Sequence, residues 1–166
     1  YMDAFERIFY NAFLAGVFRD GKWGARGVRG AGRHFFVESQ AKFTHNHCCV
    51  NNMPRAFITM QESAVMKRGN TILINLYEAI RYEDKEVKIE VGDGYFTSGK
   101  VSVSVFCKTD GQILALRNPV WSEKTLLCGK VLSEKGYSEV PLKQGENRFL
   151  LEFDMTPKIH PFAKEI

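Results

Sequence analysis

The sequence lacks a long apolar run, a large net charge and a usable set of cysteine pairs. No apolar stretch approaches the roughly 18 residues of a membrane-spanning helix, so the sequence predicts no membrane span. A formal net charge of only +4 is too small to indicate a nucleic-acid partner. Two of the four cysteines are adjacent, and because vicinal disulfides are strained, a disulfide-stapled scaffold is excluded.

What is present suits a globular chain. The 166 residues, 45% of them hydrophobic, suffice for one ordinary domain or two small ones with a real core. The first residue is Tyr1 rather than methionine, no signal peptide follows, and helical spacing begins at once. We therefore expect the downstream part of a longer protein, and the cellular compartment is left open.

The first part of the sequence is predicted to be helical. Apolar residues three and four apart predict an amphipathic helix over residues 1–18. Six glycines in residues 16–32 predict a loop, because glycine costs regular structure conformational entropy. A second helix is expected over residues 53–67, with Asn52 as N-cap and Pro54 in the first turn.

After residue 70 the apolar period changes from 3.6 to 2, which predicts strands. Val101, Val103 and Val105, for example, alternate with serines, as in a strand with one buried face. Six or more strands without intervening helices favour an antiparallel β-sandwich. The predicted fold class is α+β, with a helical segment at 1–69 and a sandwich at 70–166. The expected strands are TILINLYEAI, EVKIEVGD, KVSVSVFC, QILALRN, KTLLCGKVL and NRFLLEFDM.

The adjacent cysteines Cys48 and Cys49 are the strongest chemical signal. They are expected just before a helix N-terminus, with His45 and His47 upstream, and both features favour a thiolate. No CxxC pair is present, so a self-contained zinc finger is excluded, but half of a shared zinc site is not. Two buried, inert thiols and a Cys/His nucleophilic dyad remain as alternatives.

Other polar candidates are weaker. Glu38 and Glu62 are isolated carboxylates and are expected on the solvated surface. Cys107 ends an alternating strand and Cys128 lies in a turn beside a glycine, so both are expected to be structural.

The order of segments resembles glycoside hydrolase family 127, the zinc-dependent β-L-arabinofuranosidases of bacteria. The resemblance extends over nearly the whole chain. It is carried, in order, by YNAFLAGVFRDG, HNHCCVNNMPRA, NTILINLYEA, SGKVSVSV, ILALRNPVW and GYSEVPLKQGENRFLLEF.

This resemblance implies a fold and a mechanism. The chain would contain the last helices of an (α/α)6-barrel catalytic domain followed by a β-sandwich. Cys48 would be the nucleophile and a zinc ligand, and Cys49 a second zinc ligand. A Glu-x-Cys motif with two further ligands, and the acid/base glutamate, would precede Tyr1. The resemblance also implies a carbohydrate substrate, a retaining mechanism and a bacterial protein of the cytoplasm or periplasm. It leaves the oligomeric state open.

The sequence departs from the family pattern at one place, and two alternative functions remain. Many family members follow the cysteine pair with Pro-Pro-Asn, but here the residues are Val50, Asn51 and Asn52, which puts the sugar specificity in doubt. The 166 residues alone are predicted to be inactive, and an inactive fragment is one alternative. The other is a non-catalytic carbohydrate-binding or scaffolding module, with stacking platforms drawn from Tyr95, Phe96, Trp121 and Tyr137.

Overall fold

A computed structural model describes residues 1–17, 26–28, 34–36, 47–132 and 135–158. For residues 16, 26–28, 34–36, 47–51 and 53 it describes only the backbone. The chain forms two compact units, a helical unit of residues 1–66 and a sandwich unit of residues 67–166. No described helix combines the length and apolar composition that crossing a bilayer requires.

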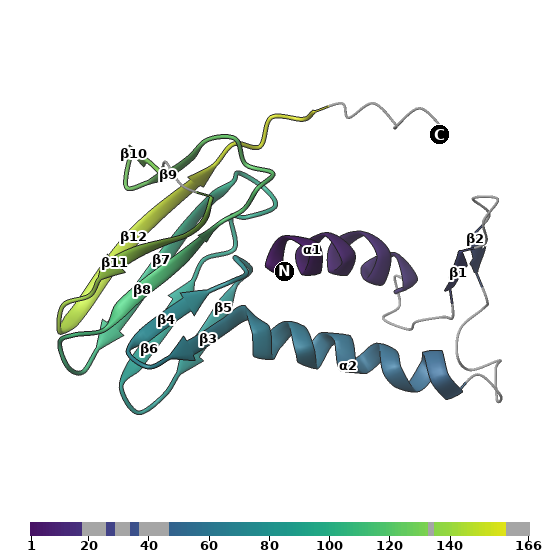
Figure 1. The fold of residues 1–166 in the computed structure, drawn as a ribbon, viewed down its shortest axis with the longest axis horizontal. Helices are drawn as coiled ribbons and strands as arrows, with labels where there is room; N and C mark the ends of the chain where they lie inside the picture. The colour runs from purple at the N-terminus through teal and green to yellow at the C-terminus, as the bar shows by residue number, and fades with distance from the viewer. Residues whose placement is uncertain (18–25, 29–33, 37–46, 133–134, 159–166) are drawn as a thin grey trace. The chain divides into compact units, whose positions relative to one another are not determined.

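The helical unit contains two helical segments, as the sequence predicts (Figure 1). The first is α1 (Met2–Arg7), which continues as a π-helical turn, η1 (Ile8–Phe13), and a 3-10 turn, η2 (Leu14–Gly16). The backbone N–H of Leu14 donates to the carbonyl of Phe9, five residues earlier, which defines the π turn. The second is α2 (His47–Ala64), which begins six residues earlier than predicted and ends three residues earlier.

Part of the segment predicted as a glycine-rich loop is a small hairpin. Strands β1 (Arg26–Val28) and β2 (His34–Phe36) pair antiparallel, with Gly27 opposite Phe35. The prediction of a loop is therefore wrong at Gly27, because backbone pairing outweighs the entropy that glycine loses in a strand.

The sandwich unit contains two sheets. The larger has the order β10-β9-β12-β7-β6-β5, and the smaller has the order β11-β8-β4-β3. The strands are β3 (Val65–Arg68), β4 (Thr71–Ile74), β5 (Ile80–Glu83), β6 (Val87–Val91), β7 (Lys100–Cys107), β8 (Ile113–Asn118), β9 (Thr125–Leu127), β10 (Lys130–Val131), β11 (Gly136–Pro141) and β12 (Gly145–Phe153).

Strand direction agrees with the prediction in the larger sheet and departs from it once in the smaller. Every neighbouring pair of the six-stranded sheet is antiparallel. In the four-stranded sheet β4 pairs with β8 in parallel, with Ile72 opposite Leu114. Between these two strands the chain makes β5, β6 and β7 of the other sheet, so β8 returns in the same direction as β4.

The two sheets share one apolar core, which is the arrangement of a β-sandwich. Strands β4 and β8 of the smaller sheet are buried at nearly every residue, so they are covered on both faces, whereas the larger sheet buries one face. Alternate residues of β6 and β7 are buried, and the residues between them face solvent. The core side chains include Ile72, Ile74, Leu114 and Leu116 from the smaller sheet, and Val87, Ile89, Val101, Val103, Val105 and Leu151 from the larger.

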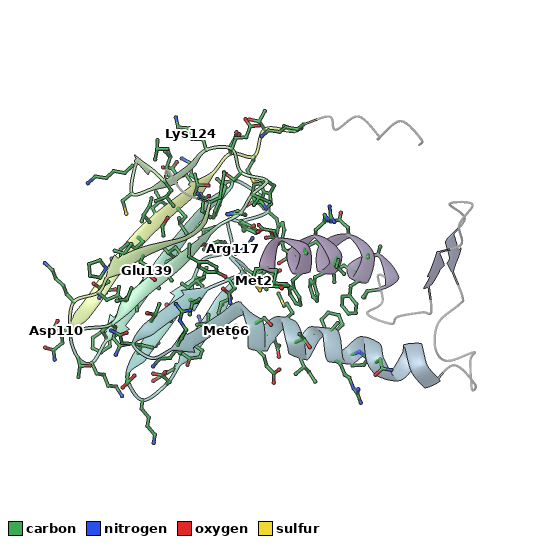
Figure 2. All side chains as sticks on the ribbon, in the orientation of Figure 1. Met2, Met66, Asp110, Arg117, Lys124 and Glu139 are labelled. Carbon is green, nitrogen blue, oxygen red and sulfur yellow. The ribbon has the colours of Figure 1, made fainter. Side chains whose placement is uncertain are left out.

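A buried polar network lies beside this core. Arg117 of β8 is 1% exposed, and its Nε donates to the carbonyl of Asn75 at 2.5 Å. The hydroxyl of Tyr77 donates to the carbonyl of Arg117 at 2.6 Å. Figure 2 labels Arg117, near the end of β8, and Asp110, in the turn that precedes the start of β8. These bonds attach the segment after β4 to β8.

Candidate functional site

The paired cysteines lie inside a helix rather than before it. Cys48 and Cys49 are the second and third residues of α2 (His47–Ala64), so the predicted position just upstream of the helix is wrong. Their backbone N–H groups are among the first four of the helix, which have no intrahelical acceptor. The first turn contains no acidic residue. The positive end of the helix dipole therefore acts at these two positions without a nearby carboxylate on the same turn.

Pro54 explains why the sequence predicted a later start. Proline usually occupies the first turn, but here it is the eighth residue of α2. Because proline has no N–H, the carbonyl of Val50 loses its usual partner four residues on. The helix nevertheless continues through this point, which adds a turn containing the cysteines.

An aromatic cluster holds α2 against η1 within the helical unit. The ring of Phe57 lies 6.1 Å from that of Phe9 and 4.9 Å from that of Phe13, both edge to face. Phe9 is 6% exposed. Phe57 is nine residues after Cys48, about 13 Å along the helix axis. The cluster thus fixes α2 more than two turns from the cysteines.

The side chains of Cys48, Cys49 and His47, and the whole of His45 and Glu38, lie outside the described residues. The proposed thiol and imidazole contacts therefore remain predictions. Where side chains are described, no three His, Cys, Asp or Glu residues are grouped so that they could hold a metal ion.

The donor chemistry of the pair does fit zinc, which takes thiolate sulfur readily. Two adjacent cysteines provide at most two of the four ligands that a structural or catalytic zinc ion needs. The pair therefore fits half of a zinc site.

A buried carboxylate in the helical unit was not singled out from the sequence. Glu6 of α1 is 4% exposed, whereas Glu62 of α2 is exposed as expected. The available signal was spacing, because Glu6 is three residues before the buried Phe9 and shares its helix face. Buried carboxylates are uncommon in proteins.

The other two cysteines have opposite environments. Cys107 at the end of β7 is fully buried, and burial raises the pKa of its thiol, with a smaller contribution from Asp110. Cys128 is exposed and lies with Gly129 in the two-residue turn between β9 and β10. Both turn residues have positive φ, 49° and 80°, as a type I′ turn requires.

The aromatic residues considered as sugar-stacking platforms mostly belong to a packed cluster. Tyr95 is 3% exposed and contacts the rings of Phe96, Trp121 and Phe153 at 5.0–5.8 Å. The hydroxyl of Tyr137 donates to Oδ1 of Asn75. Tyr95 therefore cannot stack on a ligand, while Phe96 and Trp121 are 55% and 38% exposed.

Comparison with solved structures finds similar chains, and three of them are glycoside hydrolases. One is a GH127 β-L-arabinofuranosidase from Geobacillus stearothermophilus T6, with a TM-score of 0.72 and 25% identity over 96% of this chain. A glycoside hydrolase (TM-score 0.63, 22% identity) and a GH127 β-arabinofuranosidase (TM-score 0.62, 19% identity) each cover 93% of it. The chain spans only 29%, 29% and 28% of these three chains respectively.

The sequence comparisons find no match. No family model matches the chain, and no curated protein matches it. The structural likeness confirms the resemblance to glycoside hydrolase family 127, and the chain is related in fold to part of a glycoside hydrolase.

Proposed function

We propose that the chain is part of a zinc-dependent retaining glycoside hydrolase of the β-L-arabinofuranosidase type, acting on plant-type glycans. One observation carries this proposal: the likeness to a GH127 β-L-arabinofuranosidase extends over 96% of the chain. Because the chain spans 29% of that protein, the proposed activity belongs to the complete parent protein. The 166 residues alone are expected to be inactive.

Cys48 is the proposed nucleophile. Its thiolate attacks the anomeric carbon, the bond from that carbon to the glycosidic oxygen breaks, and a general acid protonates the leaving oxygen. Water then hydrolyses the resulting thioglycoside, which returns the thiolate and retains the anomeric configuration. Most retaining glycosidases use a carboxylate for this step, so a cysteine nucleophile predicts a covalent adduct on sulfur.

The position of the pair in α2 favours the thiolate. Unpaired N–H groups and the positive end of the helix dipole stabilise a negative charge at the second and third residues of a helix. Cys48 and Cys49 would also hold the zinc ion, which when bound keeps both thiols deprotonated near neutral pH. The remaining ligands and the acid/base glutamate are proposed to precede Tyr1.

Activity of cysteine variants in the parent protein tests this proposal. Cys48→Ala and Cys49→Ala should each abolish hydrolysis of a nitrophenyl β-L-arabinofuranoside, and both should lower the zinc content measured by elemental analysis. Cys128→Ala is the matched control, because this thiol is exposed in a turn of the sandwich unit. Full turnover by Cys48→Ala contradicts the proposed nucleophile. Loss of activity in the control as well shows that the variants merely misfold.

A further inference from the structure

The outward face of the six-stranded sheet bears two adjoining hollows. One, of about 630 Å³, lies over β5, β6 and β7, and the other, of about 330 Å³, extends to Glu146 of β12. Both are lined by Glu90 and Ser104, so they form one continuous depression. We call it the polar groove and define it by Arg81, Glu90, Asp93, Ser102, Ser104 and Phe106.

Strand register places these side chains together. Arg81 of β5 is opposite Glu90 of β6, which is opposite Ser104 of β7. Phe106 lies two residues after Ser104 on the same face, because side chains of a strand alternate between faces. The groove therefore crosses three strands, with polar groups in one row and an aromatic ring in the next.

The floor of the groove is kept open by small residues. A Cβ atom on Gly92 would lie 2.5 Å from Oγ of Ser102, so a larger residue would make that hydroxyl rotate away from its present position. Ser102 and Ser104 occupy strand positions where β-branched or aromatic residues are preferred.

The polar groups of the groove are available to a ligand. Within the described part of the chain, no hydrogen bond or ion pair engages the side chains of Arg81, Asp93, Ser102 or Ser104. Glu90 has only Lys88 at 3.8 Å, and both are about half exposed. Such an exposed pair contributes little, so a ligand can displace it at small cost.

The chemistry of these groups selects a class of ligand. A guanidinium group, carboxylates and hydroxyl groups supply both donors and acceptors, which neighbouring sugar hydroxyls can satisfy in pairs. Glu146 is ion-paired with Arg148 at 2.8 Å, which leaves the carboxylates of Glu90 and Asp93 facing the cations of Arg81 and Lys88. These charges balance, so the groove favours neither an anionic nor a cationic ligand, as suits a neutral one.

The aromatic residue of the groove completes this selection. Phe106 is 49% exposed, an uncommon state for a phenylalanine ring on a sheet face. Its ring can stack on the C–H face of a sugar. We propose that the polar groove binds a neutral oligosaccharide, as a site separate from the cysteine chemistry.

Binding of neutral glycans by the 166-residue chain tests this proposal. The probes are soluble arabinan and arabinoxylan in isothermal titration, with polygalacturonate as the anionic comparison. The wild-type chain should bind a neutral glycan, and Arg81→Ala and Phe106→Ala should each weaken binding about tenfold. Lys130→Ala and Val131→Ala are matched controls, because both residues are exposed on β10 of the same sheet and should bind as wild type does.

Four results would overturn the proposal: no binding of either neutral glycan, tighter binding of polygalacturonate, unchanged affinity in both groove variants, or equal losses in the controls. A further contradiction would be a Phe106→Ala variant that changes the oligomeric mass but not glycan affinity, since the groove would then be a protein interface. The replaced side chains are exposed, so thermal unfolding should show intact folds. Cys48→Ala should bind like wild type, which separates failure here from failure of the proposed enzyme activity.

Discussion

Asp84 is the carboxylate whose loss should most destabilise the sandwich unit. Its Oδ2 accepts from Nζ of Lys67 at 2.8 Å and from the hydroxyl of Tyr82 at 3.1 Å. Its Oδ1 accepts from the backbone N–H groups of Glu86 and Val87, both at 2.8 Å. One side chain therefore fixes the turn between β5 and β6 and ties it to the end of β3.

These bonds make stability depend on pH in a defined direction. Burial opposes ionisation of Asp84 and is the largest single influence, yet the hydrogen bonds from Lys67, the backbone and Tyr82 together hold its pKa well below the usual range. A lowered folded-state pKa stabilises the fold above the unfolded-state pKa of about 3.9, and this contribution is lost as pH falls below it. Hydrogen bonds to Asp84 and Glu86 raise the pKa of Lys67, so its contribution is lost only in strong alkali.

The magnitude follows from the bonds removed. Asp84→Ala leaves two backbone donors and the ammonium of Lys67 without this acceptor, although the ammonium keeps Glu86 at 2.8 Å. Charged hydrogen bonds of this kind contribute about 1.5–3 kcal/mol each before solvent screening. The side chains of Lys67 and Asp84 are 21% and 26% exposed, so screening is partial. We expect a total loss of about 2–3 kcal/mol at neutral pH.

Urea denaturation of Asp84→Ala, Asp84→Asn and wild type at pH 7, 5 and 3 measures this loss. The difference between Asp84→Asn and wild type should be largest at pH 7 and 5 and should shrink at pH 3. Glu83→Gln is the matched control, because this neighbouring carboxylate is exposed. It should change stability by less than about 0.5 kcal/mol. A difference that is independent of pH, or equally large in the control, would refute the reasoning.

Three further predictions concern the sandwich unit. Under native conditions a thiol reagent should modify Cys128 rapidly and spare Cys107, which is fully buried; equal rates would contradict this burial. Gly94→Ala should lower the free energy of unfolding by about 2–4 kcal/mol, because its Cβ would overlap the backbone carbonyl of Lys100. Gly111→Ala should lower it by only about 1 kcal/mol, because Gly111 has a φ of 88° but open space around it. The reverse order in urea titrations would disprove the close approach of Gly94 to that carbonyl. Tyr77→Phe should cost about 1–2 kcal/mol by removing a buried hydrogen bond, and an unchanged midpoint would show that the bond contributes nothing.

Strands β6 and β7 were largely predictable because their burial alternates. The segment KVSVSVFC predicted a strand over residues 100–107, and β7 spans Lys100–Cys107. The relative direction of neighbouring strands was harder to predict, since alternation identifies the buried face of a strand but not the strand that pairs with it. The parallel pairing of β4 with β8 depends on three intervening strands joining the other sheet, which no local pattern encodes. The strand β11 (Gly136–Pro141) was missed because its residues, GYSEVP, do not alternate between apolar and polar and none of them is fully buried.

The helical unit was harder to predict at its ends. Asn52 and Pro54 together are a strong start signal, but the helix extends back to His47. Similarly, Val65 and Lys67 continue the helical spacing, yet they belong to β3. In the second case strand pairing with β4 outweighs local helix propensity. The resemblance to a hydrolase family was predictable from segment order, whereas Glu6 and the polar groove required the structure.

The most direct test of the proposed function is to find where the sugar is attached. The parent protein is quenched during turnover of a β-L-arabinofuranoside and digested, and the peptides are sequenced by mass spectrometry. The peptide containing Cys48 should gain one anhydropentose on sulfur, and the same peptide of Cys48→Ala should gain none. A sugar attached to a carboxylate, or active turnover with no adduct in wild type or variant, would disprove the cysteine nucleophile.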